Sequence, residues 1–223
     1  MKKIFSMIAV FAAIAVSHNV SAQNSDLMYE GTKELDAVGV ISGSPSIFNE
    51  KGIACSLTYD FSQAHIVNFD RDNKTVIKDF GSIDDYNASH GEDFVRDWPE
   101  CLMQLVVNTC VQMNKKLKVE FYPEVPEIPE ISDIPEFANV EKKYDVVIKL
   151  ALFDMGHFVA VGSVKAGGNI AKGIMYVYEH GTQNVVAAFD LNYLRGNNVG
   201  YGDRDRLRQY GKNLAKAMAA LAK

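Results

Sequence analysis

The 223-residue chain lacks the short motifs that mark the commonest catalytic sites. It contains no H-E-x-x-H, no C-x-x-C and no G-x-S-x-G. Residues 162–169 have the glycine spacing of a phosphate-binding loop, but the lysine and serine or threonine that grip phosphate and magnesium do not follow. A dinucleotide-binding pattern begins at Gly200 and Gly202, but Asp205 replaces its third glycine. We therefore predict no cofactor and interpret both segments as connections.

Clusters of metal ligands are equally scarce. Asp154 and His157 could share a metal ion where a strand ends, but a zinc site needs three or four ligands. Asp70 and Asp72 begin like a calcium-binding loop, yet lysine and threonine occupy the next ligand position and that of the essential glycine. The sequence therefore predicts no metal site.

The chain has few cysteines: Cys55, Cys101 and Cys110. An odd number cannot all pair in disulfides. Cys101 and Cys110 fall on one predicted helix, about 13 Å apart along its axis, which is too far for a disulfide. A disulfide would therefore have to join Cys55 to one of the other two. We favour three buried thiols, because free cysteine is commonly a small core residue.

No stretch after residue 22 is apolar enough to cross a membrane. Residues 1–22 have the parts of a cleaved secretory signal: a basic start, an apolar run over residues 4–16, and a small-residue cleavage site at residues 20–22. No cysteine follows that site, which argues against an amino-terminal lipid anchor. We expect a mature chain from Gln23 that is exported and is periplasmic or outer-membrane-associated in a bacterium.

The chain carries little excess charge. Its formal net charge of −5 becomes −7 when the two lysines of the signal are removed, which argues against nucleic acid as a general partner. A hydrophobic share of 48% suits one domain with a substantial core. We expect a signal peptide at 1–22, an extended arm at 23–51, and one domain at 52–223 with a Pro/Glu-rich insert at 123–137.

Alternating apolar and polar residues predict most of the secondary structure. We place strands at residues 35–41, 52–61, 75–77, 117–122 and 144–156. Residues 173–194 are typical of a hairpin that turns at His180 and Gly181.

Two amphipathic helices are also predicted. In the first, Asp97 and Glu100 have the spacing of a capping box, and Pro99 lies in the first turn. Its apolar residues are Trp98, Leu102, Leu105, Val106, Thr109, Met113 and Leu117. The second helix begins at Asp203, and its apolar face comprises Leu207, Tyr210, Leu214, Ala217, Met218 and Leu221. The element order predicts an α+β fold, in which two helices pack on a mixed or mostly antiparallel sheet.

The segments YDVVIKLALFDMG (144–156) and GIMYVYEHGTQNVVAAFDLN (173–192), with the closing helix, carry a resemblance to known families. Over residues 52–223 the chain resembles the TolB amino-terminal domain and a group of exported bacterial families of unknown function. The resemblance is one of fold and contains no catalytic motif. It implies envelope assembly or binding by association.

The second helix has an ordered charge pattern. Arg204, Arg208, Lys212 and Lys216 recur every four residues, so they form a basic ridge along one side of that helix. We interpret the ridge as a solvated face. The alternative is a docking site for an acidic partner or for anionic lipid headgroups.

Residues 123–137 read PEVPEIPEISDIPEF, which is five triplets in a row. Its prolines exclude a regular helix, whereas a polyproline II segment has three residues per turn. In that conformation one stripe is acidic and another is apolar. The apolar strip comprises Val125, Ile128, Ile131, Ile134 and Phe137. We predict that the strip is packed, either on the body of the protein or on a partner, because exposing it would be costly. The remaining alternative is a true linker.

These observations favour an exported, non-enzymatic binding or assembly protein of the bacterial cell envelope. The apolar strip and the basic ridge are its candidate partner-binding residues. One alternative is a hydrolase whose site is assembled from scattered residues. Another is a protein that docks on a membrane surface through the basic ridge.

Overall fold

The computed structural model describes residues 37–69, 76–124, 140–154, 170–195 and 203–222, and its central element is an eight-stranded sheet. The strands are β1 (Ala37–Ser42), β2 (Ala54–Asp60), β3 (His65–Phe69), β4 (Val76–Gly81), β5 (Glu120–Pro123), β6 (Tyr144–Asp154), β7 (Ile170–Glu179) and β8 (Val185–Arg195). The helices in these ranges are α1 (Ile83–His90), α2 (Glu92–Asn114) and α5 (Asp203–Leu221), besides a 3-10 helix at Pro45–Asn49. The predicted α+β class is confirmed.

The sheet is mixed. Its strand order is β1-β8-β7-β6-β2-β5, and the β3–β4 hairpin is attached to β6. Strands β1, β8, β7 and β6 are antiparallel neighbours, whereas β2 pairs in parallel with both β6 and β5. Strand β3 also pairs with β6 in parallel, beyond the point where β2 ends. The long strand β6 therefore joins the antiparallel and parallel halves of the sheet.

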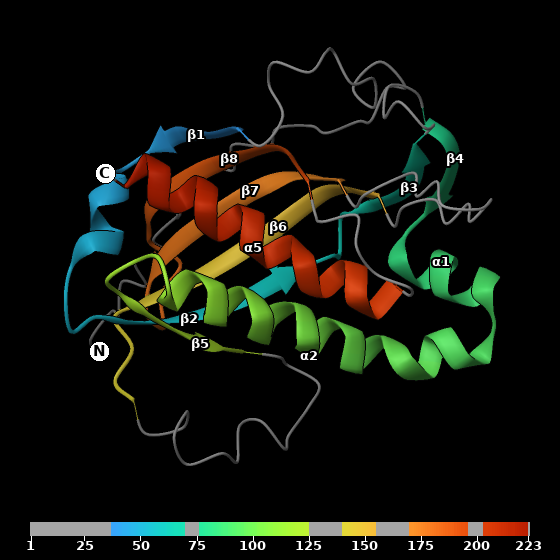
Figure 1. Cartoon of the computed structure of the whole chain (residues 1–223), viewed down its shortest axis with the longest axis horizontal. Helices are drawn as coiled ribbons and strands as arrows, with labels where there is room; N and C mark the ends of the chain where they lie inside the picture. Colours follow the sequence, from blue (N-terminus) through green and yellow to red (C-terminus); the bar gives the residue numbers. More distant parts are fainter. Residues whose placement is uncertain (1–36, 70–75, 125–139, 155–169, 196–202, 223) are drawn as a thin grey trace, which may run out of the picture.

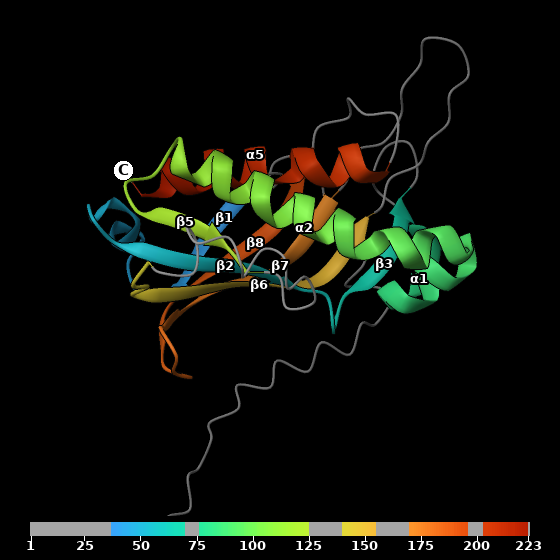
Figure 2. The ribbon, with the colours of Figure 1, turned by 90° about the horizontal axis from the view of Figure 1, so that it is seen from below.

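Helices α2 and α5 pack side by side on one face of the sheet (Figures 1 and 2). Alternate residues of the strands point toward these helices, and in β2 these are Cys55, Leu57 and Tyr59, all buried. The Tyr59 hydroxyl lies 2.9 Å from the Thr109 hydroxyl of α2, deep in the layer between sheet and helices. The core thus lies between the sheet and these helices. The residues that alternate with the core residues along each strand face the other side of the sheet.

The two long helices approach closely where α5 has a glycine. A Cβ atom on Gly211 would lie only 2.6 Å from Thr109 Cα on α2, so no larger residue fits without movement. The Thr109 hydroxyl donates to the Leu105 carbonyl within its own helix. This contact fixes how far apart α2 and α5 sit above the sheet.

The predicted start of the first helix is wrong. Helix α2 begins at Glu92 rather than after a cap at Asp97, and Pro99 lies inside it. The preceding helix α1 was absent from the prediction, although Ser82 and Asp85 form a capping box at its start. Gly91, with φ of +99°, separates the two helices. The D-x-x-E spacing at Asp97 imitated a helix start inside a longer helix.

Other predicted features agree with the structure. The hairpin of β7 and β8 turns at His180 and Gly181, as expected. All three cysteines are free and buried, which confirms the preferred interpretation. Within the described ranges, no helix has both the length and the apolar character needed to cross a membrane.

Candidate functional site on the open face of the sheet

The face of the sheet opposite α2 and α5 is covered by none of the described helices (Figure 2). The same alternation that buries half of each strand places the other half on this open face. In β6 these are Asp145, Val147 and Lys149, which are all more exposed than Val146 and Ile148 between them. The open face therefore carries the more exposed residues of β6.

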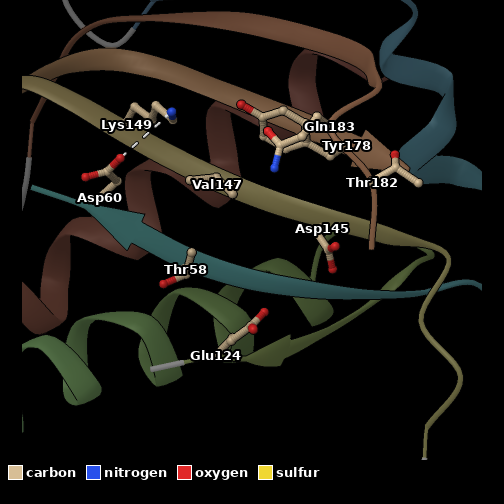
Figure 3. A pocket seen from close by; sticks show the side chains of 9 residues that line it. All are labelled: Thr58, Asp60, Glu124, Asp145, Val147, Lys149, Tyr178, Thr182 and Gln183. Atoms are coloured by element: carbon tan, nitrogen blue, oxygen red, sulfur yellow. Dashed lines mark ion pairs between the residues drawn. The ribbon is translucent and has the colours of Figure 1, made fainter. Parts of the chain in front are cut away.

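A hollow with a volume of about 350 Å³ lies on the open face (Figure 3). We call it the groove. Its walls come from the three neighbouring strands β2, β6 and β7, from the residue that follows β5, and from the β7–β8 turn. The residues that line it are Thr58, Asp60, Glu124, Asp145, Val147, Lys149, Tyr178, Thr182 and Gln183. Val147 lies among the charged and polar side chains, which surround it in Figure 3. The groove is thus a polar basin with an apolar residue on its floor.

Asp145 is the best-anchored charged group of the groove. Its Oδ1 atom accepts a 2.7 Å hydrogen bond from Ser56 Oγ and lies 2.7 Å from His180 Nδ1, while Oδ2 accepts from the Gly181 N–H at 2.9 Å. Partial burial raises the pKa of the Asp145 carboxyl, but these hydrogen bonds and the attraction of His180 outweigh it and lower the pKa overall. Asp145 is therefore ionised at neutral pH and ties the β7–β8 turn to β6.

Ser56, His180 and Asp145 do not form a catalytic triad. In a triad the imidazole lies between serine and carboxylate and takes the serine proton. Here Ser56 and His180 bind the same carboxylate oxygen instead. The Ser56 side chain donates its hydrogen to Asp145, and the residue is only 1% exposed. The cluster is arranged to hold the turn in place rather than to activate a nucleophile.

Lys149 and Asp60 form a loose ion pair across the groove. The Lys149 Nζ atom lies 4.0 Å from Asp60 Oδ2, and the two side chains are 50% and 31% exposed. The same ammonium lies 5.8 Å from the centre of the Tyr176 ring. Exposed pairs at this separation contribute about 0–1 kcal/mol, so Lys149 is held only weakly.

Two tyrosines stand next to each other on β7. The rings of Tyr176 and Tyr178 have centroids 5.9 Å apart and are tilted by 31°. Tyr178 lines the groove, and both partial burial and the nearby Asp60 carboxylate raise the pKa of its hydroxyl. The pair supplies an aromatic surface beside the carboxylates.

Glu124 contributes the third carboxylate and comes from the start of the triplet segment. Its N–H donates to the Leu57 carbonyl at 2.9 Å, so its backbone continues the pairing of β5 with β2. Its side chain is exposed, and within the described ranges its carboxylate has no ion-pair partner. Pro123, immediately before it, is buried. Glu124 therefore places the described start of the triplet segment at the rim of the groove.

The predicted site residues fall in different places. Lys212 and Lys216 are exposed on α5, and Arg204 and Arg208 belong to the same helix, although their side chains lie outside the description. The five residues of the apolar strip lie outside the described residues, as do both glycine-rich segments, Asp70, Asp72 and His157. Among the residues that are described, no three histidine, cysteine or acidic side chains gather to hold a metal ion. The apolar strip and the basic ridge thus stay predictions.

The groove itself was missed from the sequence. A signal for it existed in the polar residues that alternate with core residues, namely Ser56, Thr58 and Asp60 in β2. That alternation indicates which face is open. It does not reveal that Glu124, which follows β5, and Asp145, on β6, lie on either side of β2, because that depends on the strand order.

Comparisons with known proteins give little. No protein-family model matches the chain, and no curated protein matches it. Among solved structures, two crystal forms of the PelC dodecamer from Paraburkholderia phytofirmans, one of them a point variant, align with 10% identity each. They cover 84% of this chain and 99% and 98% of their own chains, with TM-scores of 0.37 and 0.35. Scores this low support no conclusion about this chain.

Proposed function

We propose that the protein is an exported, non-enzymatic binding or assembly protein of the bacterial cell envelope, and that it holds a partner on the open face of its sheet. The observation that carries the proposal is the groove. It combines three carboxylates, a lysine and an aromatic ring from β2, β6, β7 and the residue that follows β5. Sites built on strands keep their geometry better than sites built on loops.

The shape of the groove favours a large partner. Pockets for small molecules usually enclose most of the ligand surface. The groove instead lies open on a sheet face, with the rim residues Thr182 and Gln183 exposed. A partner protein would supply the missing wall and exclude water from the polar groups. Export is supported by the three-part pattern of residues 1–22.

Site-specific photo-crosslinking in the native host tests the binding face. A photoreactive amino acid at Gln183, on the rim of the groove, should give a discrete covalent adduct. The same amino acid at Val95, an exposed position of α2 outside the basic ridge, is the position control. Val147→Arg should fill the floor of the groove and abolish the adduct from Gln183. Val111→Arg, at an exposed valine of α2, should leave it unchanged. Circular dichroism must show that both variants are folded.

Two results would contradict the binding face. Adducts of the same size and yield from Gln183 and Val95 would show contact without a preferred face. An adduct that survives Val147→Arg would remove the groove from the contact. Export has a separate test, since mass spectrometry of protein from the periplasmic fraction should find Gln23 as the first residue. Cytoplasmic protein that retains residues 1–22 would overturn the proposed location.

A further inference from the structure

We propose that the groove binds an arginine side chain of the partner protein. The inference rests on the proposed function and specifies the chemistry of the contact. Three features of the groove carry it: its charge, the weak hold on its own lysine, and the flat aromatic surface beside its carboxylates.

The charge of the groove is unbalanced. Among the described residues that line it, Asp60, Glu124 and Asp145 face one ammonium, that of Lys149. The three carboxylates come from β2, the end of β5 and β6, which are adjacent strands, so their negative potentials add over one small basin. Hydrogen bonds hold Asp145 in its ionised form. A cationic group on a partner therefore matches the groove, whereas a carboxylate would be repelled.

Lys149 does not neutralise the basin. Its ammonium is 4.0 Å from Asp60 and its side chain is half exposed. The centre of the Tyr176 ring lies 5.8 Å from that ammonium, so the ring offers it a cation–π contact as an alternative to Asp60. An arriving cation can therefore take over Asp60 while Lys149 swings toward Tyr176, with little cost because neither contact is tight.

The neighbouring groups suit a guanidinium better than an ammonium. A guanidinium is flat, donates in a fixed fork to carboxylates, and stacks on aromatic rings. The groove offers Asp60 and Glu124 as acceptors and the Tyr178 ring as a flat surface. Val147 on the floor can contact the aliphatic stem that precedes the guanidinium. An ammonium would use the carboxylates but gain less from the ring.

The test uses three blocked tripeptides with glycine on either side of arginine, lysine or citrulline, titrated into isotope-labelled protein. Citrulline keeps the shape of arginine without its charge. The arginine peptide should bind in the millimolar range and shift the amide NMR signals of Val147, Tyr178 and Gln183. We expect the lysine peptide to bind at least about threefold more weakly and the citrulline peptide at least about tenfold more weakly.

A charge-matched pair of variants locates the effect. Asp60→Asn with Glu124→Gln should weaken binding of the arginine peptide at least about fivefold, since it removes two of the three carboxylates. Asp84→Asn with Glu92→Gln removes two exposed carboxylates from the start of α1 and of α2, outside the groove, and should leave binding unchanged. If both variants weakened binding of the arginine peptide equally, the net charge of the protein would explain the binding, and the proposal would be overturned.

Other outcomes separate this inference from the proposed function. Citrulline binding as tightly as arginine, or lysine binding as tightly, would overturn the arginine proposal. If the Gln183 adduct formed equally in the Asp60→Asn, Glu124→Gln variant, the groove would remain a partner site without selectivity for a cation. If the Gln183 adduct failed to form in the native protein as well, the proposed function would fall with it.

Discussion

His180 Nδ1 lies 2.7 Å from Asp145 Oδ1. This contact attaches the turn between β7 and β8 to the start of β6. The contact requires a hydrogen on Nδ1, since a carboxylate oxygen can only accept. Ser56 and the Gly181 N–H complete the attachment. One carboxylate thus connects β2, β6 and the hairpin turn at one end of the groove.

Replacing that carboxylate should loosen the turn. We expect Asp145→Asn to lower the free energy of unfolding by about 2 kcal/mol, because hydrogen bonds to a charged acceptor are lost and one amide hydrogen faces the Gly181 or Ser56 donor. Urea denaturation measures the change. Glu141→Gln, at an exposed position with no ion pair among the described residues, is the control and should change stability by less than about 0.5 kcal/mol. Equal stability of wild type and Asp145→Asn would contradict the role of this network.

The same network predicts a pH dependence. The pKa of the Asp145 carboxyl is lowered on folding, so its contribution is present above the unfolded pKa of about 3.9 and is lost as the pH falls through the folded value. The part of the stability difference between wild type and Asp145→Asn that comes from the Asp145 charge should therefore shrink as the pH falls below about 4. Denaturation at a series of pH values tests this. A difference that grows as the pH falls below about 4 would have the wrong sign.

Asp190 should behave in the opposite way. Partial burial raises the pKa of its carboxyl, and the attraction of Lys172 offsets this only in part. Its charge therefore opposes folding at neutral pH, and this penalty disappears as the pH falls through the raised pKa. Asp190→Asn should raise the melting temperature at pH 7 by up to about 4 °C and give a smaller gain at pH 4. A loss of stability at pH 7 would show that the pairing with Lys172 dominates.

The three thiols should be protected from reagents in the folded protein. Burial raises the pKa of the Cys55 thiol to about 12, and burial also raises that of Cys110, so these two thiols form almost no reactive thiolate at pH 8. The Cys101 side chain is also buried, which keeps the reagent away from it. Ellman's reagent should react at least about 100-fold more slowly with native protein than with protein in urea. Protein unfolded without reductant should react as three free thiols per chain. One reactive thiol per chain would instead reveal a disulfide.

The contact between α2 and α5 makes Gly211 sensitive. Alanine normally stabilises a helix interior by about 1 kcal/mol relative to glycine. At position 211 the added methyl group would collide with the backbone of Thr109, so Gly211→Ala should instead destabilise the protein by about 1–3 kcal/mol. Thermal unfolding reports the sign directly. A raised melting temperature would show that the helices can move apart freely.

Much of the fold could be predicted because the strands carry their own pattern. In β6 and in the β7–β8 hairpin, apolar residues alternate with polar ones and a glycine marks the turn. Helix α1 could not be found by periodicity, because only Tyr86 and Asn87 are buried in it. The start of α2 was misplaced because a good cap sequence at Asp97 occurs within a helix already begun.

The site was harder to predict than the fold for a physical reason. Asp60, Glu124 and Asp145 are far apart in the sequence, and parallel pairing brings them together. Ser56 lies opposite Asp145, and Leu57 opposite Pro123, only because β2 sits between β6 and β5. Strand order of this kind is not written in local residue patterns. The carboxylates therefore looked like ordinary surface charge until the sheet was assembled.

The long strand β6 has a consequence for how the chain folds. Cys55 to Asp60 of β2 pair with its first half, and His65 to Val67 of β3 pair with its second half. Two strands that come early in the sequence therefore depend on one strand that comes later. During synthesis, β2 and β3 leave the ribosome well before residues 144–154 and cannot complete their ladders. Pairings over such sequence distances form slowly. We propose that the chain is exported through a membrane before it folds. Such a chain would benefit from that delay, because β6, the strand that completes the sheet, is synthesised late.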